Sequence, residues 1–486
     1  MAVKQLRCYV LLVAVTLFGI LAAPAAFGQG GGGLGGGGGG GGLGGGGGAG
    51  GGGQGGNGAA GITVDARGVL QRLSRDQGGQ LKRKRYKLAR RSLGTVARKW
   101  SPLRVVSLNR LEAAIKERRK NGLPETDMQL CLGGLTRLQY VFYLPDSNDI
   151  AIAGPAEPYY QDGEGEIRGM KSDRPVLLLT DLAIALRAFA PGQAPTPTVG
   201  CSIDPTQEGL ASYNQTLSQI RRQGIRNGNV IAESLRSSLG LQDVTVKGVS
   251  PSTHFAYILV AADYRMKLIG MGLEKPAVDI PSYIKKARGG ESMVRWWFTP
   301  NYETVRASDD GLAMELVGDG VKLVGEGEQI NADGTRRRVV RMSRASKTFV
   351  DAFTRRYAEL AAREPVYAHL RNLIDMTIAS AYIQQQDFYG QAGWSMDLFG
   401  DESQFELEFF ETPEQVDTVS RVVAKNGLLF TPTAGGITIN PTHALRKSNL
   451  LADEDGQVAK THSGVDLSSL DPLQWWWDAS GIKDVK

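Results

Sequence analysis

Hydrophobic residues recur every three or four positions in several segments, a spacing typical of amphipathic helices. The clearest spacing lies on both sides of Pro365 and predicts two packed helices. Their apolar faces consist of Phe349, Phe353, Tyr357 and Leu360 in the first helix and Leu370, Ile374, Ile378 and Ala381 in the second. Shorter helices are predicted at 109–120, 181–189, 204–220 and 230–239.

Strands are predicted where apolar and polar residues alternate, or where short apolar runs lie between turn residues. Residues 136–144 and 150–153 flank a turn and predict a β-hairpin. The runs 241–249 and 255–261 predict two paired strands, and 293–342 predicts a β-meander. Further strands are expected at 176–179, 405–410 and 436–439. This order predicts an α+β fold with mixed, largely antiparallel sheet elements, packed helices and more than one subdomain.

The first 61 residues differ in composition from the rest of the chain. Lys4 and Arg7 precede an apolar run at 9–23, and small residues follow it, which is the layout of a secretory signal peptide. Between positions 30 and 58, 24 of 29 residues are glycine, so this low-complexity stretch has almost no side chains to bury. We therefore expect a signal peptide at 1–28, a disordered glycine-rich tether at 29–61, and export to the periplasm, cell surface or medium. No later apolar run reaches the ~20 residues of a membrane span.

The remaining 425 residues are sufficient for two or three domains of ordinary size. Their hydrophobic and charged contents are those of a folded protein. Changes in composition divide them into a basic helical segment at 62–125, an α+β domain at 126–292, a domain with the meander, the helical pair and late strands at 293–440, and a polar tail at 441–486.

Positive charge is concentrated near the start of this folded part. Between Arg67 and Lys120 there are 18 basic residues and three acidic ones, although the net charge of the whole chain is only +6. The densest point is Lys82, Arg83, Lys84 and Arg85. Because an exported protein meets anionic envelope polymers first, we expect such a polymer or an envelope protein as partner and no nucleic acid. The alternative is that these side chains face water or pair with the acidic body.

Cysteine and histidine are sparse. Cys131 and Cys201 can form one disulfide or remain buried free thiols, since sequence spacing does not give their separation. Outside the predicted signal peptide, which contains Cys8, the two cysteines and four histidines are scattered along the chain, so neither a metal site nor a cofactor is expected. A single histidine without a placed nucleophile is interpreted as structural. This interpretation applies to His254 and His369.

Two groups of residues are candidate binding sites. Asp263, Arg265 and Lys267 follow the predicted strand at 255–261, and on a strand they share one face that can bind an anionic group. A charged strand edge with a local ion pair is the favoured alternative. Trp296 and Trp297 face opposite ways on a strand, so one is expected in the core. Trp297 is the candidate exposed platform for a sugar ring or a partner.

The acidic stretch near residue 400 supplies a candidate for catalysis. Glu406 and Glu408 can act as paired carboxylates in glycoside hydrolysis. Their alternation with apolar residues over 405–410 is also the ordinary pattern of a half-exposed strand, which is the preferred interpretation. The aromatic cluster Trp475–Trp477 in the polar tail is expected to dock on the body or on a partner.

Three short phrases of the sequence resemble an exported bacterial family that is identified only as a domain of unknown function. They are CSIDPT at 201–206, ADYRMK at 262–267 and RWWF at 295–298. The resemblance covers most of residues 62–440 and implies no activity, substrate or catalytic residue. We therefore expect an envelope or surface protein with a non-enzymatic binding or scaffold role. The alternative is an exported hydrolase that acts on polysaccharide or peptide through carboxylates of the body.

Overall fold

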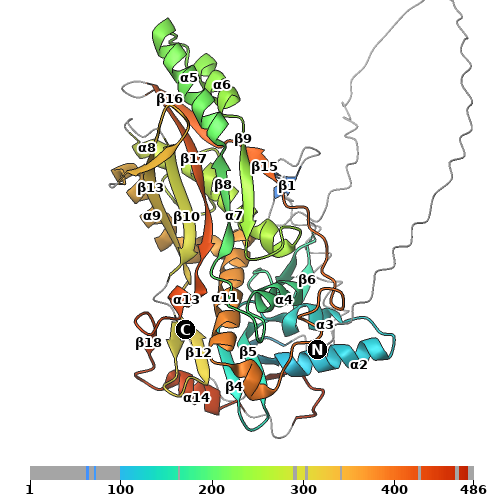
Figure 1. Ribbon diagram of the computed structural model, residues 1–486. Coiled ribbons are helices and arrows are strands. Elements are labelled where there is room, and N and C mark those ends of the chain that lie inside the picture. Colours follow the sequence, from blue (N-terminus) through green and yellow to red (C-terminus); the bar gives the residue numbers. More distant parts are fainter. Residues whose placement is uncertain are drawn as a thin grey trace, which may run out of the picture. The chain divides into compact units, whose positions relative to one another are not determined.

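The computed structural model describes residues 62–64, 70–72, 99–162, 165–287, 293–301, 305–339, 342–424, 428–465 and 470–479 (Figure 1). All of these residues belong to one compact unit, Gly53–Lys486. The predicted signal peptide, the predicted tether and Lys82–Arg85 lie outside the described residues. Within the described ranges, no helix is both long enough and apolar enough to cross a membrane.

The fold is α+β, as predicted, and is built on two large sheets. The first has eight strands in the order β14-β13-β10-β17-β8-β9-β15, and β16 pairs with β17 outside this path. These strands are β14 (Arg336–Val339), β13 (Val321–Ile330), β10 (Met293–Pro300), β17 (Leu428–Ile439), β8 (Val199–Pro205), β9 (Leu241–Lys247), β15 (Gln415–Asp417) and β16 (Ser420–Ala424). Neighbouring strands in this sheet are antiparallel except β10 and β17.

The second sheet has seven strands in the order β18-β11-β12-β4-β5-β3-β19. They are β18 (Leu451–Ala452), β11 (Val305–Ala307), β12 (Ala313–Leu316), β4 (Tyr140–Leu144), β5 (Asp149–Ala156), β3 (Ser101–Ser107) and β19 (Trp476–Asp478). Two small antiparallel pairs complete the described strands, β1 (Ile62–Val64) with β2 (Leu70–Arg72) and β6 (Tyr159–Gln161) with β7 (Ile167–Gly169).

Helices pack against both sheets and against one another. Those in the first half of the chain are α2 (Leu108–Lys120), α3 (Asp127–Leu130), the 3₁₀ helix η2 (Leu132–Gly134), α4 (Leu179–Ala188), α5 (Gln207–Gln223), α6 (Gly228–Leu239) and α7 (His254–Gly270). The later ones are α8 (Tyr283–Lys286), α9 (Arg344–Arg355), α10 (Tyr357–Ala361), α11 (Pro365–Gln385), α12 (Phe388–Ala392), α13 (Pro441–Ala444) and α14 (Gln457–Ser463).

The two central helices are α7 and α11, which contact each other. Every residue of α7 except Leu268 is buried, and α11 is buried from Pro365 to Ile383. Helix α7 packs against β8, β10 and β17 of the first sheet, and both helices contact α4 (Figure 1). Thr253 caps α7 by accepting a hydrogen bond from the backbone N–H of Ala256, and Pro365 occupies the first turn of α11, where its missing N–H costs nothing.

Several predicted elements are confirmed. The hairpin at 136–153 is β4 and β5, and the helix predicted at 109–120 is α2. The two helices around Pro365 correspond to α9 with α10 and to α11, and the helix predicted at 230–239 is α6.

The predicted strand at 255–261 is wrong, because these residues form the first turns of α7. A helix that is buried on every side has no polar face, so its apolar run resembles a buried strand. The predicted meander at 293–342 is also wrong: β10, β13 and β14 lie in the first sheet, whereas β11 and β12 lie in the second. Residues 176–178 and 405–410 are not strands, and β1, β2 and β3 lie in the segment expected to be helical.

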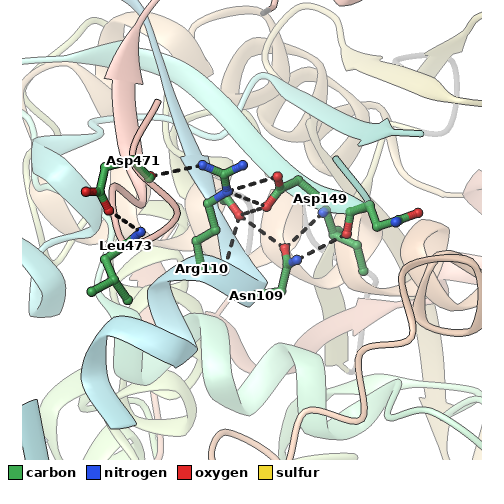
Figure 2. A network of polar contacts seen from close by, with 8 residues as sticks. Asn109, Arg110, Asp149, Asp471 and Leu473 are labelled. Atoms are coloured by element: carbon green, nitrogen blue, oxygen red, sulfur yellow. Dashed lines mark hydrogen bonds and ion pairs between the residues drawn. The ribbon is translucent and has the colours of Figure 1, made fainter. Parts of the chain in front are cut away.

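The C-terminal part packs on the second sheet, as expected for the Trp475–Trp477 cluster. Strand β19 pairs with β3, and Trp475 and Trp477 are buried. Figure 2 shows a second attachment, in which the Arg110 guanidinium pairs with the Asp149 carboxylate and donates to the backbone carbonyl of Asp471 at 3.2 Å. These contacts fix the residues around 471–478 against the hairpin of β4 and β5.

Candidate functional site

The three charged residues expected on one strand face lie on α7, and the expectation that they share a face is wrong. Successive helical residues are rotated by about 100°, so Asp263 and Lys267 lie on one side and Arg265 on the other. The Lys267 ammonium pairs with the Asp263 carboxylate at 2.9 Å and donates to the carbonyl of Ile203 at 3.0 Å. Both side chains are fully buried, so the pair joins α7 to β8 inside the core and presents no charge to an external ligand.

Arg265 is engaged in a separate buried network. Its guanidinium pairs with the Glu274 carboxylate and with the Glu364 carboxylate, the latter at 2.9 Å. Burial alone lowers the pKa of Arg265, but the hydrogen bond and charge of Glu274, together with Tyr367 and Glu364, raise it above its usual value. The guanidinium is therefore held inside the fold. Arg265 forms local ion pairs, as the alternative interpretation of the sequence expected.

The two adjacent tryptophans divide as predicted, because Trp296 is fully buried in the core. Trp297 is half-buried and lines a cavity of about 230 Å³ together with Arg295, Glu326 and Cys201. Whether this surface binds a sugar or a partner stays a prediction.

Cys131 and Cys201 are buried free thiols in this structure. Burial and the charge of Asp127 raise the pKa of Cys131 to about 12. Burial and the charge of Asp263 raise the pKa of Cys201 well above its usual value. The sequence left open a disulfide or two buried free thiols, and the structure has the free thiols.

The acidic stretch near residue 400 is irregular and exposed. Glu406 and Glu408 are exposed and do not lie on a strand. Glu406 and Glu402 line a cavity of about 700 Å³ that also includes Thr253 and the exposed Phe409. Paired carboxylates for glycoside hydrolysis need one buried member with a raised pKa, and an exposed pair does not provide it.

Three residues that are distant in the sequence meet in the interior. Glu166, His254 and His369 each direct one ligand atom into a space where these atoms lie within 4.8 Å of one another. All three side chains are buried. Nε2 of His369 is 2.7 Å from Oε2 of Glu166, and the two imidazole rings lie edge to face with their centroids 5.2 Å apart. The expectation that the scattered histidines form no ligand cluster is therefore wrong for His254 and His369, which lie together with Glu166.

Four elements position the cluster. His254 is the first residue of α7 after its Thr253 cap, and His369 lies on the buried helix α11. Glu166 immediately precedes β7, where its N–H donates to the Asp162 carboxylate at 3.0 Å. The cluster thus depends on the packing of α7, α11, α4 and the β6–β7 pair rather than on a local motif.

Asp181 on α4 orients His254 from outside the cluster. Its carboxylate oxygens lie 2.9 and 3.1 Å from Nδ1 of His254, which directs Nε2 as the ring nitrogen available for a ligand. Carboxylates that hold the outer nitrogen of a ligating histidine are the usual second layer of a metal site. The Phe410 ring lies against the same imidazole with centroids 5.1 Å apart and shields it on that side.

The charges in the cluster support one another. Burial alone raises the pKa of Glu166, but the charge and hydrogen bond of His369 and the charge of His254 lower it to about 2. Burial alone lowers the pKa of His254, whereas the charge and hydrogen bond of Asp181 and the charges of Glu166 and Glu408 raise it. The anionic carboxylates therefore require a balancing positive charge, which a proton or a metal ion can supply.

The residues fit a divalent transition metal. Two histidines and one carboxylate form the protein ligand set of many catalytic zinc sites and of non-haem iron(II) sites. Ligand atoms at about 2.0–2.2 Å from a tetrahedral zinc ion lie about 3.3 Å apart. The separations here bracket this distance, from 2.7 Å to at most 4.8 Å, so small side-chain rotations suffice.

Sequence reasoning missed this site because its members come from positions 166, 254 and 369 without a spacing motif. The available signal was the position of two histidines within otherwise apolar runs, His254 before FAYILVAA and His369 within a buried helix. Glu166 lies among other acidic and glycine residues and carries no distinguishing signal.

Comparison with models of protein families gives a match to part of the chain. Residues 201–283 match the model of a family described as "Protein of unknown function (DUF1598)". No protein with a curated description and no solved structure matches the chain. The match contains two of the phrases that carry the resemblance, CSIDPT and ADYRMK, and it contains His254 but neither Glu166 nor His369. The expected similarity to a family of unknown function is thus confirmed over β8 to the start of α8, with no activity to carry over.

Proposed function

We propose that this protein is an exported metal-binding protein that holds a divalent transition-metal ion with Glu166, His254 and His369. The observation that supports the proposal is the convergence of these three buried side chains, with ligand atoms within 4.8 Å of one another. Asp181 supplies the second-layer carboxylate that fixes the ring of His254. The competing interpretation is a protonated histidine–carboxylate cluster that only stabilises the fold.

Zinc binding distinguishes these interpretations. Purified protein is treated with a chelator, freed of it, and titrated with Zn²⁺ by calorimetry and elemental analysis. We expect one equivalent of bound metal in the wild type. Glu166→Gln and His369→Gln keep the size of each side chain but remove a ligand, so binding is expected to be lost or strongly weakened.

Two further variants sharpen the test. Asp181→Asn removes only the second-layer charge and is expected to weaken binding by about 10–100-fold. His443→Gln changes a histidine on α13 outside the cluster and is expected to bind as the wild type does. Equal binding by the wild type, Glu166→Gln and His369→Gln would assign any bound metal to another place.

Export and envelope association remain part of the proposal. The signal-like and glycine-rich residues 1–61 support export, and the basic excess between Arg67 and Lys120 supports binding to an anionic envelope polymer or envelope protein. Deleting the whole basic segment is not a clean test, because Leu111 and Ile115 of α2 are fully buried. Replacing Lys82–Arg85 with glutamine removes four positive charges and changes none of the described residues.

The assay is co-sedimentation with isolated cell envelopes over a salt series. We expect the wild type to bind and to dissociate with increasing salt, and the Lys82–Arg85 variant to bind more weakly. Replacement of the exposed Arg221 and Arg222 on α5 with glutamine removes positive charge elsewhere on the surface, and this control is expected to have no effect. Undiminished binding of the Lys82–Arg85 variant would exclude the basic run as the attachment.

A second candidate function is metal-assisted hydrolysis of polysaccharide or peptide. It is favoured by the cavity of about 700 Å³, whose lining includes Thr253, the residue immediately before His254. The same cavity is lined by the Glu406 carboxylate, the Ser252 hydroxyl group and the exposed aromatic ring of Phe409. Hydrolysis that needs added Zn²⁺ and is lost in Glu166→Gln would support this function. Activity that is equal in metal-free and zinc-loaded protein would contradict it.

A further inference from the structure

Helix α11 carries a second buried polar group on a different side from His369. Arg371 follows His369 by two positions, which corresponds to about 200° around the helix. Its side chain is 4% exposed, and in the described structure neither Nε nor Nη2 has a hydrogen-bond partner. Asn372 is 2% exposed, and both its amide nitrogen and its amide oxygen are likewise without partners there. Buried polar atoms are nearly always hydrogen-bonded, so each of these atoms needs a partner, either a water molecule or a ligand.

The unpartnered atoms of Arg371 form one edge of the guanidinium group. Nε–H and Nη2–H point in the same direction, and this edge matches the two oxygens of a carboxylate, phosphate or sulfate. Asp375, one turn later on α11, is not within ion-pair distance of Arg371 among the described contacts. Among the described ion pairs, Asp375 pairs with Arg137, with Nε of Arg137 3.7 Å from Oδ2 of Asp375.

Positive charge is in excess around this edge. Burial and the charges of Arg137 and Arg174 lower the pKa of Arg371 to about 10, while Asp375 opposes them, so the guanidinium remains charged at neutral pH. Burial raises the pKa of Asp375 to about 6 against the charges of Arg137 and Arg371, with Asp319 acting in the same direction as burial. The charges of three arginines (Arg137, Arg174 and Arg371) and of two carboxylates (Asp319 and Asp375) therefore act on one another here. Water can satisfy the N–H groups but cannot neutralise the excess charge.

The turn between β12 and β13 closes over the group. Arg137 donates to the backbone carbonyl groups of Leu316 and Gly318, which fixes its guanidinium beneath the turn. Gly320 lies so close that a Cβ at this position would be 3.1 Å from Oδ1 of Asp375. The backbone of the turn therefore lies directly against the Arg137 and Asp375 side chains.

We propose that Arg371 binds a small oxyanion on its Nε–Nη2 edge. Arg137 and Arg174 supply the balancing positive charge, and the amide of Asn372 on the same helical turn is a further donor. The ligand class is a phosphate, a sulfate or the carboxylate group of a small metabolite. This site uses none of the proposed metal ligands, so the proposal does not depend on whether the protein binds a metal.

The test is thermal unfolding of chelator-treated protein at constant ionic strength, with chloride replaced stepwise by inorganic phosphate, sulfate or acetate. Removing metal first prevents an anion from acting through the other site. We expect the melting temperature of the wild type to rise by several degrees at saturating concentrations of the preferred anion, since a ligand that binds only the native state stabilises it. Comparison of the tetrahedral anions with acetate identifies the preferred ligand class.

Arg371→Met removes the buried charge and keeps much of the side-chain volume. Without an oxyanion it is expected to be at least as stable as the wild type, because it no longer buries an unbalanced charge. As phosphate or sulfate is added, the wild type should become more stable than the variant. Arg236→Met, which changes an exposed arginine on α6, is the control and should respond as the wild type does.

Two results would overturn the proposal. One is a wild type whose melting temperature is the same in chloride, phosphate, sulfate and acetate, which means that water alone fills the site. The other is an equal rise in the wild type and in Arg371→Met, which places anion binding elsewhere. If Arg371→Met does not fold, calorimetric titration of the wild type with each anion decides, and no measurable binding would contradict the site.

Discussion

Lys267→Met is expected to destabilise the protein strongly. The Lys267 ammonium and the Asp263 carboxylate are fully buried, 2.9 Å apart, and the ammonium also donates to the Ile203 carbonyl at 3.0 Å. Methionine fills most of the space of the lysine stem, so the main effect is an unpaired buried carboxylate. Breaking a buried pair in this way costs about 3–5 kcal/mol.

A double substitution separates the charge from the packing. In Asp263→Asn/Lys267→Met no charge remains, so we expect recovery of about 1–3 kcal/mol relative to Lys267→Met alone. The loss in Lys267→Met should also become smaller at low pH. Burial raises the pKa of Asp263 even with Lys267 present. Without Lys267 the folded-state pKa rises further above the unfolded value, so stability is regained as the pH falls and lost as it rises.

The assay is equilibrium unfolding in urea, followed by tryptophan fluorescence at pH 7 and pH 5. The reasoning is refuted if Lys267→Met unfolds within about 1 kcal/mol of the wild type. It is also refuted if the two substitutions are additive, because additive effects mean that the side chains do not interact.

Three further predictions concern the core. Gly435→Ala should lower the free energy of unfolding in denaturant by at least about 3 kcal/mol, because φ is +148° and the new Cβ would lie 1.6 Å from the Trp296 carbonyl oxygen. A variant as stable as the wild type would contradict this close approach. Since the pKa of Asp375 is raised from 3.8 to about 6, the wild type should gain about 2 kcal/mol relative to Asp375→Asn as the pH falls from 7 to 4; a pH-independent difference would contradict the raised pKa. Cys131 and Cys201 should resist a thiol reagent in the native protein and react after denaturation, and rapid native labelling would show that they are accessible.

Local pattern was sufficient for much of the fold. The α+β class, the β4–β5 hairpin and the helices on both sides of Pro365 follow from short-range periodicity and turn residues. These elements each have one buried and one exposed face, or a defined turn, so their period is visible in the sequence.

Local pattern failed where burial is complete or pairing is long-range. Helix α7 has no polar stripe to mark its period, so its apolar run was interpreted as a strand. In the same way, the pairing of β10 with β17 joins residues more than 100 positions apart, which no local turn signals. The division of β10–β14 between two sheets likewise depends on tertiary contacts.

The candidate site could not be predicted for the same reason. His254 and His369 were interpreted separately as structural residues, because their sequence positions do not show that α7 and α11 pack against each other. Glu166 enters the cluster through the position of the β6–β7 pair, and Asp181 through α4. A buried polar residue within an apolar run was the only sequence feature that marked any of them.

The most direct test of the proposed function is X-ray absorption spectroscopy of the zinc-loaded protein at the zinc edge. We predict two imidazole nitrogens and at least one oxygen at about 2.0–2.2 Å, with outer-shell scattering from both rings. In His369→Gln one imidazole contribution should be lost. A shell of oxygen atoms without imidazole scattering, or a spectrum that is identical in the wild type and His369→Gln, would contradict a metal centre at Glu166, His254 and His369.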